Sequence, residues 1–404
     1  MTTGGTAADA GEGSPIRVPA GFRAAGVYAG LYARRERLDV GLVLADEAFP
    51  AAALFTTSRM NGAHVTLGRE HLRRSGGRVR ALLVNTRSAN CSTGDPGLAD
   101  QRRLAGALGE LVGCPPEQVL SLSTGVIGLP LPMERILAAL PRLVATARAE
   151  GAEDFARAIM TTDTVPKLVP VGAAGGRSVL GIAKGSGMIH PDLATMLAFL
   201  LTDAEVPGAA EGAGELLERT AAQSFQRLSV DGDTSPNDTL LLWGSGARGR
   251  CAPDELLADL CAASRELCRR IAADGEGATR LVTIRVEGAE TPEAAVHVGR
   301  VIATSPLTKT AVNGRDPNWG RILAAAARSG VAFDPARARV WIGTAELFAG
   351  GLPRPENEAR AHAHLEGEPE VVLGIDLGCG AAAAEVWTCD LSADYVRINA
   401  DYRS

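Results

Sequence analysis

The chain has 404 residues, with 41 lysines and arginines against 47 aspartates and glutamates, and a net charge of −6 at pH 7. This balance lacks the basic field that nonspecific binding to nucleic acid or to an anionic membrane requires, so neither partner is expected. Hydrophobic residues make up 46% and charged residues 22%, as in globular proteins, and the length predicts two or three structural units. The longest apolar run, residues 193–201, is shorter than the roughly 20 residues of a spanning helix.

The first 15 residues are small and polar, without the basic start and apolar stretch of a signal or transit peptide. We therefore expect a disordered tail over residues 1–15 and a cytoplasmic protein. The seven cysteines are widely spread, with no Cys-x-x-Cys pair, which indicates free thiols in a reducing compartment. His362 and His364 have no third ligand nearby in the sequence, so we expect surface histidines and no metal site.

The predicted elements alternate along the chain and indicate an α+β fold. In the first 129 residues, strands are predicted at 40–44 and 79–84 and a helix near 97–113. Residues 130–160 are predicted to be helical with a break at Pro141, because a helix-interior proline removes a hydrogen bond. The later predictions are strands around a Gly-Gly turn over 168–183, a loop over 184–195 that leads into an apolar strand, helices over 208–228 and 253–273, and strands over 281–287, 297–303, 339–343 and 371–376.

Only three of the 41 basic residues are lysines, namely Lys167, Lys184 and Lys309. Lysine carries a compact point charge with an adjustable pKa, and the planar fork of arginine cannot replace it at a site that needs this geometry. The three lysines are either chance survivors of a composition bias or members of such sites. Each of them lies in a segment that resembles a motif for other reasons.

Thr195 stands at the end of a loop rich in glycine and proline, where the backbone can be held in a strained turn. A threonine there can attack the preceding carbonyl and form an ester by an N–O acyl shift, and hydrolysis of the ester releases Thr195 as a new N-terminus. An α-amino group has a pKa of about 7.7–8.0, so Thr195 would then carry its own base. The alternative is an ordinary core threonine in an apolar strand.

Three other segments carry groups suited to a small polar ligand. STGVIG at 123–128 follows a predicted strand and could direct a backbone N–H and a hydroxyl at an oxyanion, or simply end the strand. The run TTDT at 161–164 could hold a ligand or form a cap or turn. DGEG at 274–277 exposes a carboxylate between two glycines, either for an ammonium group or as a solvated turn. The C-terminal ten residues are apolar and aromatic, which suggests a docked end.

Taken in order, these segments resemble the bifunctional ornithine acetyltransferase family, also called glutamate N-acetyltransferase, of arginine biosynthesis. The resemblance spans nearly the whole chain after the tail, and all three lysines fall inside matched blocks. The matching blocks are STGVIG (123–128), MTTDTVPK (160–167), KGSGMIHPDLATML (184–197), DGDT (231–234), DGEGAT (274–279), SPLTKTA (305–311), DPNWGRI (316–322) and YVRINADY (395–402).

The resemblance implies a self-cleaving acyltransferase of the N-terminal-nucleophile type, with layered sheets between helices. The precursor would cut itself between Ala194 and Thr195 into an alpha chain, 16–194, and a beta chain, 195–404. Acetyl would pass from N-acetylornithine to Thr195 and then to glutamate in a ping-pong sequence that needs no cofactor. Whether acetyl-CoA is also a donor stays open. Two alpha and two beta chains would form a heterotetramer or a larger assembly.

The resemblance also carries over site residues. Thr124 and Gly125 match the oxyanion-hole positions of the family. The positions that match its substrate-binding residues are Thr161, Lys184, Thr195, Glu276, Asn399 and Ser404. As our own hypothesis, Lys184 and Asn399 bind the carboxylate of the N-acyl amino acid, and Glu276 binds its ammonium group.

Four departures from the family pattern put the substrate in question. Ser58 stands where Asn is usual, residues 85–90 read NTRSAN rather than NSGNAN, Pro236 replaces a threonine, and Ser404 stands where Thr is commoner. A paralogue that acts on another donor or acceptor is therefore one alternative. An N-terminal-nucleophile aminopeptidase or amidase is a second, and a binding protein without activity is a third.

Overall fold

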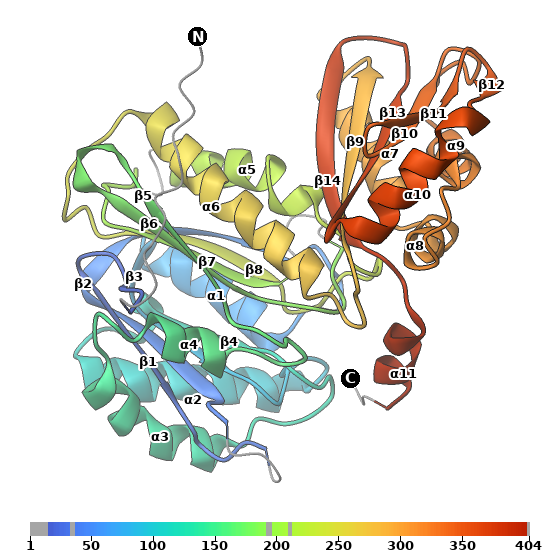
Figure 1. Ribbon diagram of the computed structural model, residues 1–404. Helices are drawn as coiled ribbons and strands as arrows, with labels where there is room; N and C mark the ends of the chain where they lie inside the picture. Colours follow the sequence, from blue (N-terminus) through green and yellow to red (C-terminus); the bar gives the residue numbers. More distant parts are fainter. Residues whose placement is uncertain (1–14, 33–36, 191–195, 209–211, 402–404) are drawn as a thin grey trace.

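The computed structural model describes residues 15–32, 37–190, 196–208 and 212–401, which form a larger lobe and a smaller lobe (Figure 1). The larger lobe holds a sheet with the strand order β4-β3-β2-β8-β7-β6-β5, and β1 pairs with β2. Its strands are β1 (Phe22–Val27), β2 (Val40–Phe55), β3 (Arg78–Asn85), β4 (Val119–Ser123), β5 (Lys167–Gly172), β6 (Ser178–Lys184), β7 (Leu197–Thr202) and β8 (Thr239–Gly244).

The long strand β2 folds this sheet into two layers. Its first part pairs with β1 and β3, whereas residues 51–55 pair with β8. Apolar side chains of the β1–β4 half and of the β5–β8 half, such as Leu82 and Phe199, bury each other in one core cluster. Alternate side chains of a strand point to opposite faces, so each half also presents an outer apolar face that needs cover.

Helices cover both outer faces. α2 (Gly94–Val112) and α3 (Met133–Thr146) cover the β1–β4 half, and α5 (Ala213–Ala222) and α6 (Pro253–Ala273) cover the β5–β8 half. α1 (Ala63–Arg74) packs against α2 and β4, and α4 (Ala152–Ala158) packs against β1. The expected α+β fold with layered sheets between helices is confirmed, as four layers in the order helix, sheet, sheet, helix.

The smaller lobe contains a second sheet, with the strand order β12-β11-β10-β13-β9-β14. Helices α7, α9 and α10 bury apolar residues against it, including Val298, Ile322 and Leu365. Its elements are β9 (Leu281–Ala289), α7 (Pro292–Ala303), α8 (Pro306–Asn313), α9 (Trp319–Ala327), β10 (Arg339–Ile342), β11 (Ala345–Ala349), β12 (Leu352–Pro353), α10 (Glu358–Gly367), β13 (Glu370–Asp376) and β14 (Ala382–Cys389). The chain then leads to α11 (Ala393–Asp401), which lies apart from this lobe in Figure 1.

Two of the predicted elements are wrong. Residues 297–303, predicted as a strand, belong to α7, where Ala295, Val298 and Ile302 form one buried helical stripe. Thr291 caps this helix by accepting a hydrogen bond from the Ala294 amide over 3.1 Å. Pro141 does not break α3, because it lies on the exposed side of the helix, where water can solvate the carbonyl that loses its partner.

Most other predicted elements are confirmed within a few residues. They include β2, β3, α2, α5, α6, β9, β10, β13 and the hairpin of β5 and β6. Residues 1–14 of the predicted tail lie outside the described residues. Among the helices that the structure describes, none is both long and apolar enough to cross a membrane.

Candidate active site

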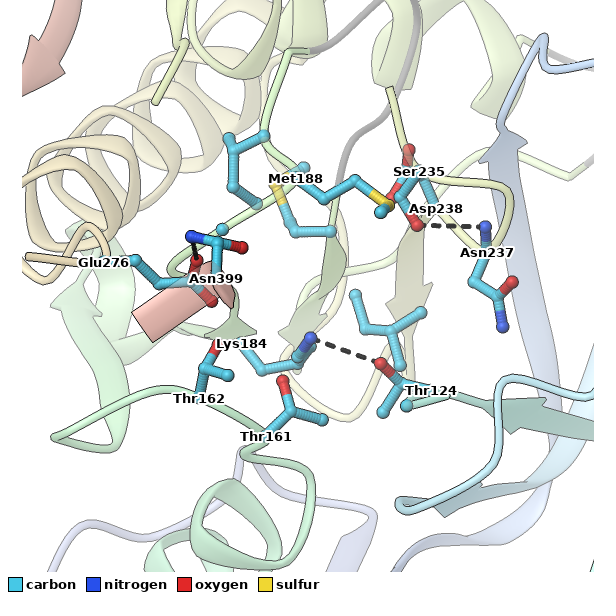
Figure 2. A pocket seen from close by; sticks show the side chains of 15 residues that line it. Thr124, Thr161, Thr162, Lys184, Met188, Ser235, Asn237, Asp238, Glu276 and Asn399 are labelled. Carbon is cyan, nitrogen blue, oxygen red and sulfur yellow. Dashed lines mark hydrogen bonds between the residues drawn. The ribbon is translucent and has the colours of Figure 1, made fainter. Parts of the chain in front are cut away.

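One pocket brings together six of the predicted site residues, which come from segments far apart in the chain (Figure 2). They are Thr124, Gly125, Thr161, Lys184, Glu276 and Asn399. Ala194, Thr195 and Ser404 lie outside the described residues. Met196, which directly follows Thr195 in the sequence, lines the pocket. The rest of the lining consists of Thr162, Gly187, Met188, Ile189, Leu197, Ser235, Asn237 and Asp238.

The backbone around Gly125 is held so that its amide faces no internal acceptor. The Thr124 amide donates to the Asn85 carbonyl and the Val126 amide donates to the Arg87 carbonyl, each over 3.0 Å. No hydrogen bond among the described residues uses the amide of Gly125 itself. Gly125 has φ 132°, and a Cβ there would lie 2.4 Å from the Arg87 carbonyl carbon, so only glycine fits. This amide can therefore donate to a ligand oxygen.

Lys184, at the end of β6, connects to Thr124 across the pocket (Figure 2). Its Nζ donates to Thr124 Oγ1 over 3.2 Å. An ammonium group only donates, so Thr124 Oγ1 accepts here and its own proton remains available to another acceptor. Burial lowers the pKa of Lys184, and the charges of Asp163 and Asp238 act in the opposite direction.

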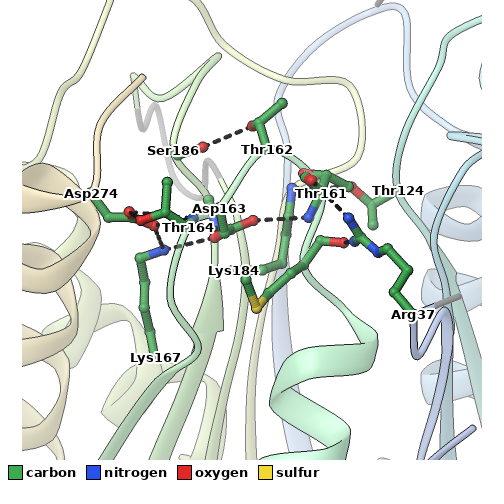
Figure 3. A network of polar contacts seen from close by, with 12 residues as sticks. Arg37, Thr124, Thr161, Thr162, Asp163, Thr164, Lys167, Lys184, Ser186 and Asp274 are labelled. Carbon is green, nitrogen blue, oxygen red and sulfur yellow. Dashed lines mark hydrogen bonds and ion pairs between the residues drawn. The ribbon is translucent and has the colours of Figure 1, made fainter. Parts of the chain in front are cut away.

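A buried ionic network holds the 161–164 run in place (Figure 3). Lys167 Nζ lies 2.7 Å from Asp163 Oδ1 and 2.6 Å from Asp274 Oδ2. Asp163 also accepts from the Gly185 amide over 2.6 Å and from the Thr161 amide over 3.0 Å. Burial alone would raise the pKa of Asp163, but the charge of Lys167, with that of Lys184 and these hydrogen bonds, lowers it to about 2. The network fixes Thr161 relative to the loop that follows β6.

Asp231 fixes the next part of this loop. Its two carboxylate oxygens accept the amides of Met188, over 2.6 Å, and Ile189, over 2.9 Å. Met188 has φ 56°, a left-handed conformation that a non-glycine residue adopts only when its surroundings compensate. The matched segments 184–197 and 231–234 are therefore in direct contact.

Glu276 and Asn399 bound the other side of the pocket and contact each other. Asn399 Nδ2 donates to Glu276 Oε2 over 2.8 Å, and the Glu276 amide donates to the Ser186 carbonyl over 2.8 Å (Figure 2). A Cβ on Gly187 would lie 2.4 Å from the Glu276 carboxylate, so glycine permits this approach. Contrary to our division of roles, the Asn399 amide is engaged by Glu276 in this structure.

The C-terminal helix α11 contacts the site with few residues. Besides Asn399, Tyr395 OH lies 3.5 Å from Asp231 Oδ2. No residue of α11 is buried, and Val396 is 65% exposed. The C-terminus is therefore docked by polar contacts at one face rather than by a packed core.

The sequence reasoning missed a second layer of residues behind Thr124. Buried Asn237 donates from Nδ2 to the carbonyls of Ala89, over 2.6 Å, and Ser123, over 2.7 Å. His64 accepts from the Ser123 amide at Nδ1 over 3.4 Å, so its Nε2 carries the proton that reaches the Asn237 carbonyl, 3.0 Å away. The only available signal was the position of Asn237 next to the altered DTSP segment.

Two of the departures from the family pattern lie at this site. Arg87, within the altered NTRSAN run, has φ 74° and forms the backbone wall behind Gly125. Pro236 lines a smaller cavity together with Ala89 and Ile127. That cavity shares Thr124 and Gly125 with the main pocket.

The other predicted candidates have structural partners. His364 Nε2 accepts from the Val372 amide over 3.1 Å, and His362 Nδ1 lies 3.7 Å from Glu366. Among the described residues, no group of three or more His, Cys, Asp or Glu side chains could hold a metal ion. All seven cysteines are free thiols, as predicted.

The fold and the pocket define an α+β protein whose layered sheets carry a polar site with a free backbone donor, a buried ammonium group and an opposing carboxylate. The chain belongs to the ArgJ family, whose model matches residues 23–404.

Curated relatives are similar over almost their whole length. The arginine biosynthesis bifunctional protein ArgJ of Parasynechococcus marenigrum is 47% identical, over 96% of this chain and 95% of that protein. The protein of the same name from Thermus thermophilus is 45% identical, over 96% of this chain and 99% of that protein.

Two solved structures were also found. One is the arginine biosynthesis bifunctional protein of Bacillus halodurans, with 33% identity and a TM-score of 0.48 over 50% of this chain and 98% of that chain. The other is the ornithine acetyltransferase of Mycobacterium tuberculosis complexed with ornithine, with 38% identity and a TM-score of 0.43 over 45% of this chain and 96% of that chain.

Proposed function

We propose that this member of the ArgJ family transfers acetyl from N-acetylornithine to glutamate through an acetyl-Thr195 intermediate, after cutting itself between Ala194 and Thr195. The observation that carries the proposal is the position of Met196. This residue, the direct neighbour of Thr195, lines the same pocket as the Gly125 amide and the Thr124 hydroxyl. A nucleophile and two donors for an oxyanion would thus share one small site.

In the proposed first half-reaction, Thr195 Oγ attacks the acetyl carbonyl while its α-amino group takes the hydroxyl proton. The Gly125 amide and the Thr124 hydroxyl stabilise the oxyanion, and Lys184 orients Thr124 by donating to its oxygen. The C–N bond breaks, the proton passes to the departing amine, and ornithine leaves. In the second half-reaction the amine of glutamate attacks the ester, and Thr195 recovers its proton.

The charges of the pocket suit this donor. Glu276 presents a carboxylate to the side-chain ammonium of N-acetylornithine, and Lys184 presents an ammonium to its carboxylate. The smaller cavity shared by Thr124 and Gly125 has the apolar side chains of Ala89, Ile127 and Pro236, which suit an acyl methyl group. No step needs a cofactor, and acetyl-CoA stays open as a second donor.

Two wider features belong to the same proposal. The alpha and beta chains stay together, and two of each form a heterotetramer or a larger assembly. The protein works in the cytoplasm, where its amino-acid substrates are made.

A second candidate reaction is hydrolysis, by an N-terminal-nucleophile aminopeptidase or amidase. The altered residues Arg87 and Pro236, which border the oxyanion region, also keep a paralogue with another donor or acceptor under consideration. The acceptor distinguishes transfer from hydrolysis: a transferase forms N-acetylglutamate in preference to acetate, whereas a hydrolase releases acetate at one rate with or without glutamate.

The test combines an intact-mass measurement with a product assay. Release of Thr195 from the 41.8 kDa chain predicts two pieces of roughly 20 and 22 kDa under denaturing conditions, with threonine first in the larger piece. Thr195→Ala should give one uncut mass and no transfer. A single full-length mass for the wild type, or wild-type turnover by Thr195→Ala, would exclude the mechanism.

A further inference from the structure

A second cavity lies where the two lobes meet and shares no lining residue with the proposed active site. Three arginines from different elements line it: Arg227 from the short 3-10 turn Phe225–Arg227, Arg265 from α6 and Arg285 from β9. Glu385 and Trp387 of β14 complete the part of the lining that carries polar groups, together with Glu287. The positive charges outnumber the negative ones.

The guanidinium groups are anchored by one edge and keep further N–H donors. Arg227 Nε donates to the Ala222 carbonyl over 2.9 Å, and Arg265 donates to the backbone and side chain of Gln223 over 3.1 Å. Arg285 pairs with Glu385 over 2.9 Å. Among the ion pairs between described residues, none involves Arg227 or Arg265. Two guanidinium charges therefore face one cavity without a paired carboxylate.

The electrostatics of Arg227 point in the same direction. Burial, and then the like charge of Arg265, lower the pKa of Arg227 below its usual value. Each cause penalises the charged form, and an anion between the two groups would remove that penalty.

Trp387 supplies an independent observation. Its side chain lines this cavity and is only 3% exposed. Its indole Nε1 is buried and has no acceptor in the described part of the chain. A buried N–H without a partner costs roughly 1–3 kcal/mol, so such a group in a native protein calls for an acceptor.

We propose that this cavity is an anion site that binds a phosphate group. Arginine forks match phosphate oxygens, and donors that approach from three elements suit a tetrahedral ion better than a planar carboxylate. One phosphate oxygen accepts from the Trp387 indole, and the others accept from Arg227 and Arg265. The phosphate comes either from the free inorganic ion or from the phosphate group of a nucleotide or coenzyme.

The site adjoins the segment that leads to the pocket. The Ser229 amide donates to the Trp387 carbonyl over 2.9 Å, and the Val230 amide donates to the Ile189 carbonyl over 2.7 Å. Because these two pockets have separate linings, phosphate should bind equally well when ornithine is present.

The test is titration of the whole protein with inorganic phosphate, at constant ionic strength, observed at the indole ¹⁵N–H signals of its four tryptophans. Trp387→Phe assigns one signal by its loss. We expect phosphate to shift that signal alone, and Arg227→Gln or Arg265→Gln to weaken the apparent affinity at least about tenfold, equivalent to about 1.4 kcal/mol. Arg250→Gln, a change at an exposed ion pair elsewhere, is the matched control.

Adenosine diphosphate in place of phosphate separates the two sources. Tighter binding of the nucleotide identifies a phosphate-bearing metabolite, and equal or weaker binding identifies the free ion. An unmoved Trp387 signal, or unchanged affinity in both arginine variants, would overturn the proposal. The readout involves no turnover, so it stands apart from the test of the acetyltransferase.

Discussion

Lys184 and Thr124, 60 residues apart in the sequence, are joined by a hydrogen bond of 3.2 Å at the centre of the pocket. The bond comes from the ends of two strands, β6 and β4, that belong to opposite layers of the larger lobe. Because the lysine can only donate, the bond determines which atom of Thr124 remains free to donate to a substrate.

Lys184→Met should therefore impair transfer through Thr124. We expect kcat to fall about 10²-fold, the typical effect of losing an oxyanion donor, and a similar fall for Thr124→Val. The double variant should be little worse than either single one, because the two residues act as one unit. Steady-state kinetics of all four proteins test this, and fully additive losses would contradict it.

Gly125→Ala should remove acetyl transfer for a steric reason. The added Cβ would lie 2.4 Å from the Arg87 carbonyl carbon, so the amide must move, with an expected loss in kcat of about 10²–10³-fold. Gly128→Ala is the matched control, because Gly128 also has a positive φ, 75°, but a Cβ there meets nothing within 4 Å. Equal losses in the two variants would assign the effect to backbone strain alone.

Glu276→Gln separates the two substrates of the proposed reaction. Loss of the carboxylate should raise KM for N-acetylornithine about tenfold or more, as expected for a hydrogen bond to a charged group. KM for glutamate should stay the same or fall, since glutamate carries no side-chain ammonium. Initial rates with each substrate varied in turn measure both constants, and Glu266→Gln on the exposed side of α6 serves as control. An equal rise in both constants would indicate that Glu276 only positions the loop at Ser186.

His64 should make the protein less stable below neutral pH. Burial lowers its pKa from 6.5 to about 4, so between these values the unfolded chain binds a proton that the folded protein does not. The free energy of unfolding should therefore decrease as the pH falls from 6.5 to 4, by about 3 kcal/mol from this group.

His64→Gln should flatten this part of the pH profile. Urea unfolding at pH 7.5, 6 and 5 measures it, and His297→Gln, at an exposed position with a single backbone partner, should keep the wild-type slope. The same slope in the wild type and in His64→Gln would show that the buried imidazole does not carry the effect.

The sequence by itself determined the local elements and the identity of most site residues. Apolar periodicity located most helices and strands, because it reflects which face of each element is buried. It failed at 297–303, where the apolar spacing fits a helical stripe as well as a strand. The scarcity of lysine pointed correctly at special positions: Lys167 and Lys309 are buried in polar networks, and Lys184 lines the pocket.

Only the tertiary structure decided how these residues meet. The pairing of Asn399 with Glu276, the support of Thr124 by His64 and Asn237, and the arginine cavity beside Trp387 all join segments that are distant in sequence. Short motifs record the conformation of a few neighbouring residues. Contacts across layers and lobes depend instead on how whole sheets and helices bury their apolar faces, which no local pattern records.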